Sequence, residues 1–342
     1  MRKNPPIVKP STTDRLTRSF TVLVLAWICL LPQFTGRASW AQEAEASAAE
    51  APAATSPVPE PLRFDGLPND FWSSDETPVY PRGVAIVEDR LIVVDSDAHG
   101  VWSIPWPATE PASPKLLVRG TRYLRRVINR PFCAIGHPTG GVLVGDSPTR
   151  EIYHVVTDAS ETAPEKQRIT PLNDGFLGIP MALAVSPEGD LLYVGDAERR
   201  ATFRLPITGG RPELVARVNA RGLVFDDSGT LWAVTPDAEA VKKIDVATGD
   251  VTAIVSGRPY GFPGGISIEG DTGFVSDVYG KCIWSFTFDG KTEKWYEDDV
   301  LKGPVGLVAT RDSVIVADPK NKQVYRIDRE TKQIRSLFAT PK

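Results

Sequence analysis

Four arginines and two aromatic residues are the side chains whose types best suit ligand binding in this chain of 342 residues. They are Arg82, Arg126, Arg130, Arg221, Phe132 and Tyr260. A guanidinium group offers carboxylates and phosphates a planar fork of hydrogen-bond donors, and it stacks well on aromatic rings. The set therefore predicts a pocket for a small anion, a sugar acid or an acidic peptide. One alternative stays open, in which the arginines pair with acids such as Glu76, Asp174 and Asp226 on a solvated face.

Histidine chemistry is the second candidate. His99 follows Asp97 by two residues, a spacing that would allow an acid–base pair, although a solvated loop explains the same residues. The other two histidines, His137 and His154, give no metal-ligand spacing. The chain also lacks a Cys/His zinc pattern, a Gly-x-Ser-x-Gly elbow and a phosphate-binding glycine loop. We therefore predict no catalytic set, no metal and no cofactor, with Ca²⁺ or another divalent ion unsupported by the residues.

The elements that position these side chains come from a repeat. One pattern, two short apolar runs separated by a turn, occurs six times in the sequence. Each copy ends on a polar residue 14 to 16 positions after its first residue. The copies open at Pro81, Pro131, Pro180, Ala220, Pro263 and Pro304. They close at Asp95, Asp146, Asp196, Thr235, Asp277 and Asp318. Two further apolar runs follow each copy, so we predict an all-β, six-bladed β-propeller with four-stranded blades over residues 81–340.

The closing aspartates are predicted to be structural. An Asp at the end of a strand accepts backbone N–H bonds from the turn that follows, and recurrence in five of the six copies favours architecture over an active site. The second residue of each copy faces the channel mouth in this prediction, and the third is always small because inner strands crowd near the axis. The second residues are Arg82, Phe132, Met181, Arg221, Gly264 and Val305.

The last copy carries a family resemblance. Its hairpin from Val316 to Val324 resembles the NHL repeat, which runs Pro-x-Gly-hydrophobic and then Val-x-Asp-x-x-Asn-x-x-hydrophobic. The region from Pro81 to Phe338 also looks like the regucalcin and gluconolactonase-like propellers, which are six-bladed. In those enzymes Glu, Asn and Asp ligands at the starts of inner strands hold a divalent metal. The matching positions here carry Arg82, Met181 and Arg221, and the family's Asn-Asp-Gly falls on Pro131 to Cys133, so the expected oxygen ligands are missing.

The N-terminal region has a different composition. Residues 1–41 combine early basic residues, an apolar run from Phe20 to Leu31 and small residues around Trp40, which predicts a signal peptide and export to the periplasm or outside the cell. An uncleaved anchor is the alternative. Residues 42–61 are rich in Ala, Glu and Pro and predict a disordered linker, followed by a lead-in segment, 62–80.

Charge and cysteine content complete the prediction. Residues 1–41 carry six Lys or Arg and one Asp, so without them the formal net charge falls from −4 to −9, which argues against nucleic acid as a partner. Cys133 and Cys282 stand in different copies and predict two free thiols. We expect a monomeric, non-catalytic binding or scaffold module for a small anion or a protein partner. The alternatives are a gluconolactonase-like hydrolase with a rearranged metal site and, more weakly, a metal-free lyase or synthase built around His99.

Overall fold

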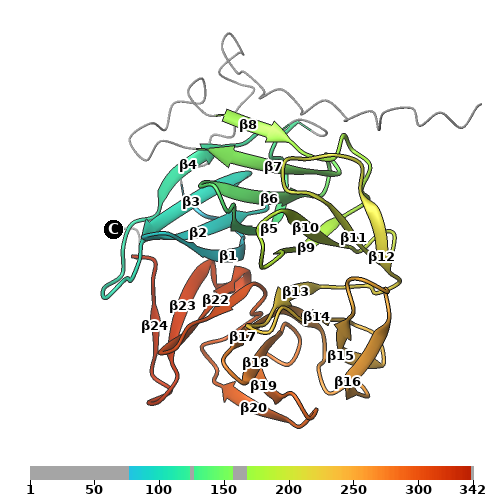
Figure 1. The fold of residues 1–342 in the computed structure, drawn as a ribbon. Helices are drawn as coiled ribbons and strands as arrows, with labels where there is room; N and C mark the ends of the chain where they lie inside the picture. The colour runs from blue at the N-terminus through green and yellow to red at the C-terminus, as the bar shows by residue number, and fades with distance from the viewer. Residues whose placement is uncertain (1–76, 124–126, 157–167, 340–342) are drawn as a thin grey trace, which may run out of the picture. The chain divides into compact units, whose positions relative to one another are not determined.

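A computed structural model describes residues 77–123, 127–156 and 168–339. In this part of the chain, 24 strands form six four-stranded antiparallel sheets, and the sheets are arranged as the blades of a propeller (Figure 1). The predicted six-bladed fold is confirmed. The predicted signal peptide, the linker and residues 62–76 of the lead-in segment lie outside the described residues.

Each blade uses four consecutive strands, with the first strand innermost. The first three blades contain β1 (Pro81–Val87), β2 (Arg90–Asp95), β3 (Gly100–Pro105) and β4 (Lys115–Arg119); β5 (Pro131–Gly136), β6 (Val142–Asp146), β7 (Glu151–Val156) and β8 (Arg168–Pro171); β9 (Pro180–Val185), β10 (Leu191–Asp196), β11 (Ala201–Pro206) and β12 (Glu213–Ala216). The last three contain β13 (Gly222–Phe225), β14 (Leu231–Val234), β15 (Glu239–Ile244) and β16 (Val251–Ser256); β17 (Pro263–Glu269), β18 (Thr272–Asp277), β19 (Cys282–Thr287) and β20 (Thr292–Glu297); β21 (Leu307–Ala309), β22 (Ser313–Asp318), β23 (Gln323–Asp328) and β24 (Ile334–Ser336). One turn of 3₁₀ helix, η3 (Pro319–Asn321), lies in the last hairpin.

The hydrophobic core is divided among the spaces between neighbouring blades. Second strands such as β2 and β22 are buried along almost their whole length, which explains their continuous β-branched runs. Alternate residues of each inner strand face the blade on either side, so Val84 packs with Ile315 of the last blade, whereas Ala85 packs with Val144 of the second. Each interface therefore repeats the same packing, and the ring is held by six similar cores.

The first and last blades close the ring directly. The loop between β3 and β4 contacts the segment that follows β24, where Ala112 forms a parallel bridge with Phe338. The Ala112 N–H donates to the Leu337 carbonyl at 2.9 Å, and Arg335 Nη1 donates to the Thr109 carbonyl at 3.1 Å. No helix among the described residues is long and apolar enough to cross a membrane.

Four of the six inner strands contain a β-bulge at the second residue of the copy. In the first blade Pro81 pairs with Asp95 and Gly83 pairs with Val94, so Arg82 has no partner of its own in the ladder. The same shift in register leaves out the second residue in the second, third and fifth blades, namely Phe132, Met181 and Gly264. A bulge redirects the side chain of the extra residue. The next position must be small, because a Cβ on Gly83 would lie 3.1 Å from the Cys133 Cα.

Candidate functional site

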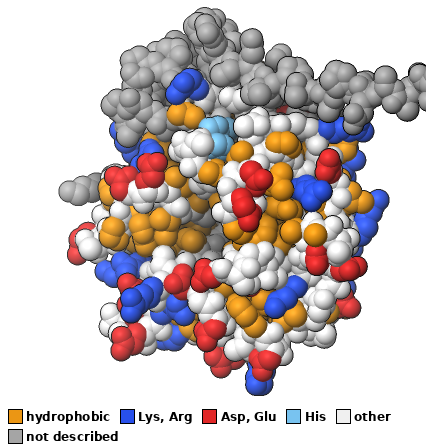
Figure 2. All heavy atoms as spheres, viewed as in Figure 1, with side chains coloured by type: hydrophobic (Ala, Val, Ile, Leu, Met, Phe, Trp, Pro, Cys, Tyr) orange, Lys and Arg blue, Asp and Glu red, His pale blue; other side chains and the backbone are white. Residues whose placement is uncertain are grey.

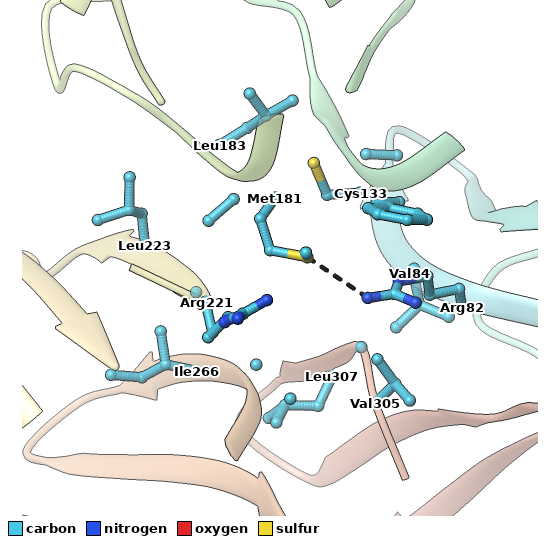
Figure 3. A pocket seen from close by; sticks show the side chains of 18 residues that line it. Arg82, Val84, Cys133, Met181, Leu183, Arg221, Leu223, Ile266, Val305 and Leu307 are labelled. Atoms are coloured by element: carbon cyan, nitrogen blue, oxygen red, sulfur yellow. Dashed lines mark hydrogen bonds between the residues drawn. The ribbon is translucent and has the colours of Figure 1, made fainter. Parts of the chain in front are cut away.

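The candidate site is the central channel at the end where the inner strands begin, which we call the channel mouth. Its cavity has a volume of about 100 Å³ and is lined by three residues from each blade (Figure 3). The second residues of the six copies all line it, as the sequence predicts: Arg82, Phe132, Met181, Arg221, Gly264 and Val305. Two of these six side chains are cationic, and none is acidic.

Arg82 lies against sulfur and an aromatic ring rather than against an acid. Its guanidinium carbon is 3.9 Å from the centre of the Phe132 ring, and its Nη2 lies 3.4 Å from the Met181 sulfur (Figure 3). A thioether is a weak acceptor, so this contact satisfies little of the guanidinium's hydrogen-bonding capacity. The Arg82 Nε is buried and has no hydrogen-bond partner among the described residues.

Arg221 approaches the same space from the opposite side. It belongs to the fourth of six blades, so it faces Arg82 of the first blade across the channel, and Figure 3 shows both guanidinium groups directed inward. Its guanidinium carbon lies 5.6 Å from the centre of the Phe262 ring. Like Arg82, it has a buried Nε without a hydrogen-bond partner in the described part of the chain.

Burial and repulsion by other arginines both act on this pair. Burial lowers the pKa of Arg82, and the charge of Arg221 lowers it further. Burial and the charge of Arg200 lower the pKa of Arg221, while the charge of Asp237 raises it. Within residues 77–123, 127–156 and 168–339, no carboxylate forms an ion pair with either guanidinium. The channel mouth therefore holds two desolvated positive charges that would be stabilised by a bound anion.

Tyr260 requires a correction, because it does not line the channel mouth. Only 5% of Tyr260 is exposed, and its ring packs edge-on against Trp284 at 5.6 Å in the core between the fourth and fifth blades. It lines a separate cavity of about 190 Å³, which we call the interblade cavity and which also contacts Asp237, Arg258 and Phe262.

Arg130 and His99 lie outside the channel lining. Arg130 is exposed and forms an ion pair with Asp97 at 3.1 Å, which is the pairing on a solvated face that the sequence left open. His99 Nδ1 contacts the Asn129 carbonyl oxygen, and no hydrogen bond joins His99 to Asp97 among the described residues. The acid–base pair is therefore not formed. Arg126 lies outside the described residues.

The closing aspartates are buried and surrounded by backbone donors. Asp95 accepts four N–H bonds, from Val79 and Tyr80 before the inner strand and from Asp97 and Ala98 in the hairpin. Asp196, Asp277 and Asp318 likewise join the segment before their inner strand to their hairpin.

Asp146 is the least satisfied closing aspartate. Its Oδ1 accepts from the Thr149 N–H at 3.3 Å and from the Thr149 hydroxyl at 3.0 Å. Its Oδ2 is buried and forms no hydrogen bond of standard geometry in the described residues, although the backbone N–H groups of Asn129 and Arg130 are close enough to lower the pKa of this carboxyl. Burial raises the pKa of this carboxyl to about 6.

The side chains at the channel mouth do not fit a Ca²⁺ site. Calcium takes several oxygen ligands, whereas the positions that match the gluconolactonase-like metal ligands carry two guanidinium groups and a thioether. No cluster of three or more His, Cys, Asp or Glu able to hold a metal occurs among the described residues. Cys133 and Cys282 are both unpaired, and burial raises the pKa of the Cys133 thiol to about 12, so this thiol stays protonated.

Sequence reasoning placed Phe262 among the aromatic residues that lead into the inner strands, but it assigned this residue no contact. The Phe262 ring centre lies 5.6 Å from the Arg221 guanidinium carbon, and Phe262 also lines the interblade cavity. One further feature was missed. His137, in the turn between β5 and β6, stacks on His154 of β7 with ring centres 3.7 Å apart, at the end of the second blade opposite the channel mouth. No spacing rule predicts such a contact.

Charge on the surface is mixed in sign. Figure 2 shows that Lys and Arg side chains alternate with Asp and Glu side chains around the rim of one face of the propeller, while hydrophobic side chains gather nearer its middle. A nucleic-acid-binding surface usually presents a continuous basic area. This face shows no such area.

Comparison with known proteins supports the fold and leaves the family open. No family model matches the chain, and no curated protein matches it. Among solved structures, a chain of the nidogen/laminin complex is similar, with a TM-score of 0.61 and 13% identity over 73% of this chain and 93% of that chain. Virginiamycin B lyase from Staphylococcus aureus has a TM-score of 0.57 and 14% identity over 79% and 87% of the two chains.

A third similar structure is the PQQ-bound aldose sugar dehydrogenase from Streptomyces coelicolor. Its TM-score is 0.54, with 12% identity over 77% of this chain and 96% of that chain. One of these three structures is a protein complex and two are enzymes, and identities this low show a common fold alone. The resemblance to NHL and regucalcin-like repeats therefore stays a prediction.

Proposed function

We propose that this propeller is an exported, non-catalytic binding module that holds a small anion of the carboxylate or phosphate class at its channel mouth. The observation that carries the proposal is the pair of inward-facing guanidinium groups of Arg82 and Arg221, each with a buried Nε that lacks a partner among the described residues. A carboxylate on a protein partner would present the same chemistry. Export rests on the signal-peptide pattern of residues 1–41.

Energetics favour an anion in this place. An unpaired buried charge costs on the order of several kcal/mol, and a partner of opposite charge with good hydrogen bonds recovers most of that cost. Each guanidinium can form a bidentate, charge-assisted pair with an oxyanion. A cavity of about 100 Å³ is also large enough for a small oxyanion, because a water molecule in the liquid occupies roughly 30 Å³.

Isothermal titration calorimetry at low ionic strength tests the proposal, with inorganic phosphate and propionate as probes. We expect binding to the wild type and at least a roughly tenfold loss of affinity in Arg82→Gln and in Arg221→Gln, because each removes one charge-assisted pair. Arg150→Gln is the matched control, since Arg150 lies in a hairpin at the same end of the blades but is already paired with Glu198 at 2.6 Å. Equal affinities in all three variants would contradict the proposal.

A further inference from the structure

The interblade cavity is a direct neighbour of the channel mouth. It lies between the hairpin that joins β14 to β15 and the segment that leads into β17. Pro263 lines the interblade cavity and the next residue, Gly264, lines the channel. Phe262 lines the interblade cavity, and its ring centre lies 5.6 Å from the guanidinium carbon of Arg221, which lines the channel. One ligand could therefore occupy both spaces.

The two cavities differ in chemistry. Carbon-rich walls of the interblade cavity come from Pro236, Ala240, Phe262 and Pro263. Its one carboxylate, on Asp237, is engaged at 3.0 Å by Arg200. The channel mouth, in contrast, is lined by two inward-facing cationic side chains that form no ion pair among the described residues, whereas the one arginine of the interblade cavity, Arg258, is exposed. A ligand that matches both spaces has an anionic end and an apolar end.

The two cavities also differ in size. The interblade cavity measures about 190 Å³, and a buried apolar cavity of roughly 150 Å³ is large enough to bind benzene. The channel cavity of about 100 Å³ is better suited to a carboxylate. Size and polarity therefore assign the ring of a ligand to the interblade cavity and its carboxylate to the channel.

Phe262 is held in place by contacts with the hairpin that follows the closing aspartate Asp277. The Phe262 N–H donates to Asp277 at 2.9 Å, and the Phe262 carbonyl accepts from the Val278 N–H at 2.9 Å. The Phe262 ring packs against Tyr279 with ring centres 5.2 Å apart, although Tyr279 itself is 68% exposed. An aromatic wall fixed in advance loses little conformational entropy when a ligand binds.

We propose that the ligand is a small carboxylic acid that carries a six-membered ring or an apolar group of similar size. Its carboxylate lies between Arg82 and Arg221, and its ring lies in the interblade cavity against Phe262. This inference rests on the proposed anion site and names the class of anion. It adds a second subsite, made by the fourth and fifth blades alone.

The test compares 3-phenylpropionate with propionate on the full chain by isothermal titration calorimetry. Burying the phenyl ring should make 3-phenylpropionate bind about ten- to a hundredfold more tightly to the wild type. Ala240→Leu fills the interblade cavity, and in this variant we expect the preference to fall below about threefold while propionate affinity stays unchanged. Unchanged propionate affinity also shows that the variant is folded.

A nuclear Overhauser measurement supplies a readout on the unmodified protein. We expect contacts between the phenyl protons of 3-phenylpropionate and the Ala240 methyl group. Equal affinity for the two acids, a preference that survives Ala240→Leu, or the absence of these contacts would overturn the inference. Failure of both acids to bind the wild type is a different result and would overturn the anion site itself.

Discussion

The closing aspartates and the channel arginines are both buried charges at the same end of the blades, and they differ in their surroundings. Asp95 accepts four backbone N–H bonds, whereas Arg82 has a weak contact with a sulfur and a buried Nε without a partner in the described residues. The aspartate recurs in five of the six copies, and the arginines occupy only two positions out of six. A buried charge that the fold repeats and satisfies stabilises the fold, and one that it leaves unsatisfied is available to a ligand.

The largest expected effect comes from removing a satisfied charge. Asp95→Ala would leave four backbone donors without an acceptor, at a cost of about 3 kcal/mol or more in the free energy of unfolding. Urea denaturation measures this loss. A loss below 1 kcal/mol would mean that the closing aspartates do not hold the segments before the inner strands, and the comparison would fail.

Asp146, the least satisfied closing aspartate, makes the free energy of unfolding depend on pH. Its pKa is raised to about 6 in the folded state by burial, above the unfolded value of 3.8, so the folded protein holds a proton that the unfolded chain has lost between these values. The stability linked to this proton is fully present below pH 3.8 and is lost as pH rises through 6. The total loss is on the order of 3 kcal/mol.

Urea denaturation at several pH values between 4 and 6 measures this effect. The variant Asp146→Asn cannot ionise at this position, so its free energy of unfolding should fall less steeply with pH than that of the wild type. Parallel curves for the two proteins would show that Asp146 titrates in the folded state as it does in the unfolded chain.

Thr235, the one closing residue that is not an aspartate, should contribute less to the free energy of unfolding. The Thr235 hydroxyl donates to the Glu239 carbonyl at 2.8 Å and accepts from the Asp237 N–H at 3.2 Å, so it serves only its own hairpin. Thr235→Ala should therefore cost about 1 kcal/mol, well below the loss in Asp95→Ala. Equal losses in the two variants, compared by urea denaturation, would remove the distinction between a local and a bridging cap.

The smallest stability change is expected at the channel. Arg82→Met replaces an unpaired buried charge by an apolar side chain beside Phe132 and Met181, so the free energy of unfolding should stay within about 1 kcal/mol of the wild type or rise. Thermal and urea unfolding of the ligand-free protein check this. A loss as large as that in Asp95→Ala would make Arg82 a structural residue.

Most of the fold could be predicted because the repeat encodes it locally. Strands and hairpins follow from apolar runs and turn residues at constant spacing, and the small third residue follows from crowding at the axis. The structure differs most from the predicted strands at the fourth and sixth inner strands. These strands begin at Gly222 and Leu307 and are shorter than the other inner strands. In the fourth blade Thr235 replaces the bridging carboxylate. In the sixth blade the Val305 N–H still donates to the Ala317 carbonyl, although regular strand pairing begins only at Leu307.

The site could be predicted only where the repeat positions it. Arg82 and Arg221 are second residues of their copies, and both face the channel. Tyr260 and Arg130 stand in the connecting segments, whose side-chain directions depend on contacts with distant residues, such as Trp284 for Tyr260 and Asp97 for Arg130. Spacing along the chain carries no information on such contacts.

The most direct test of the distinction between satisfied and available charges observes the guanidinium groups themselves. Nitrogen-15 NMR of the arginine Nε–H groups, assigned with Arg82→Met and Arg221→Met, would be followed during titration with propionate. We expect the Arg82 and Arg221 signals to shift together and saturate, while the signal of the paired Arg150 stays in place. Signals of Arg82 and Arg221 that do not move at saturating propionate would contradict the account.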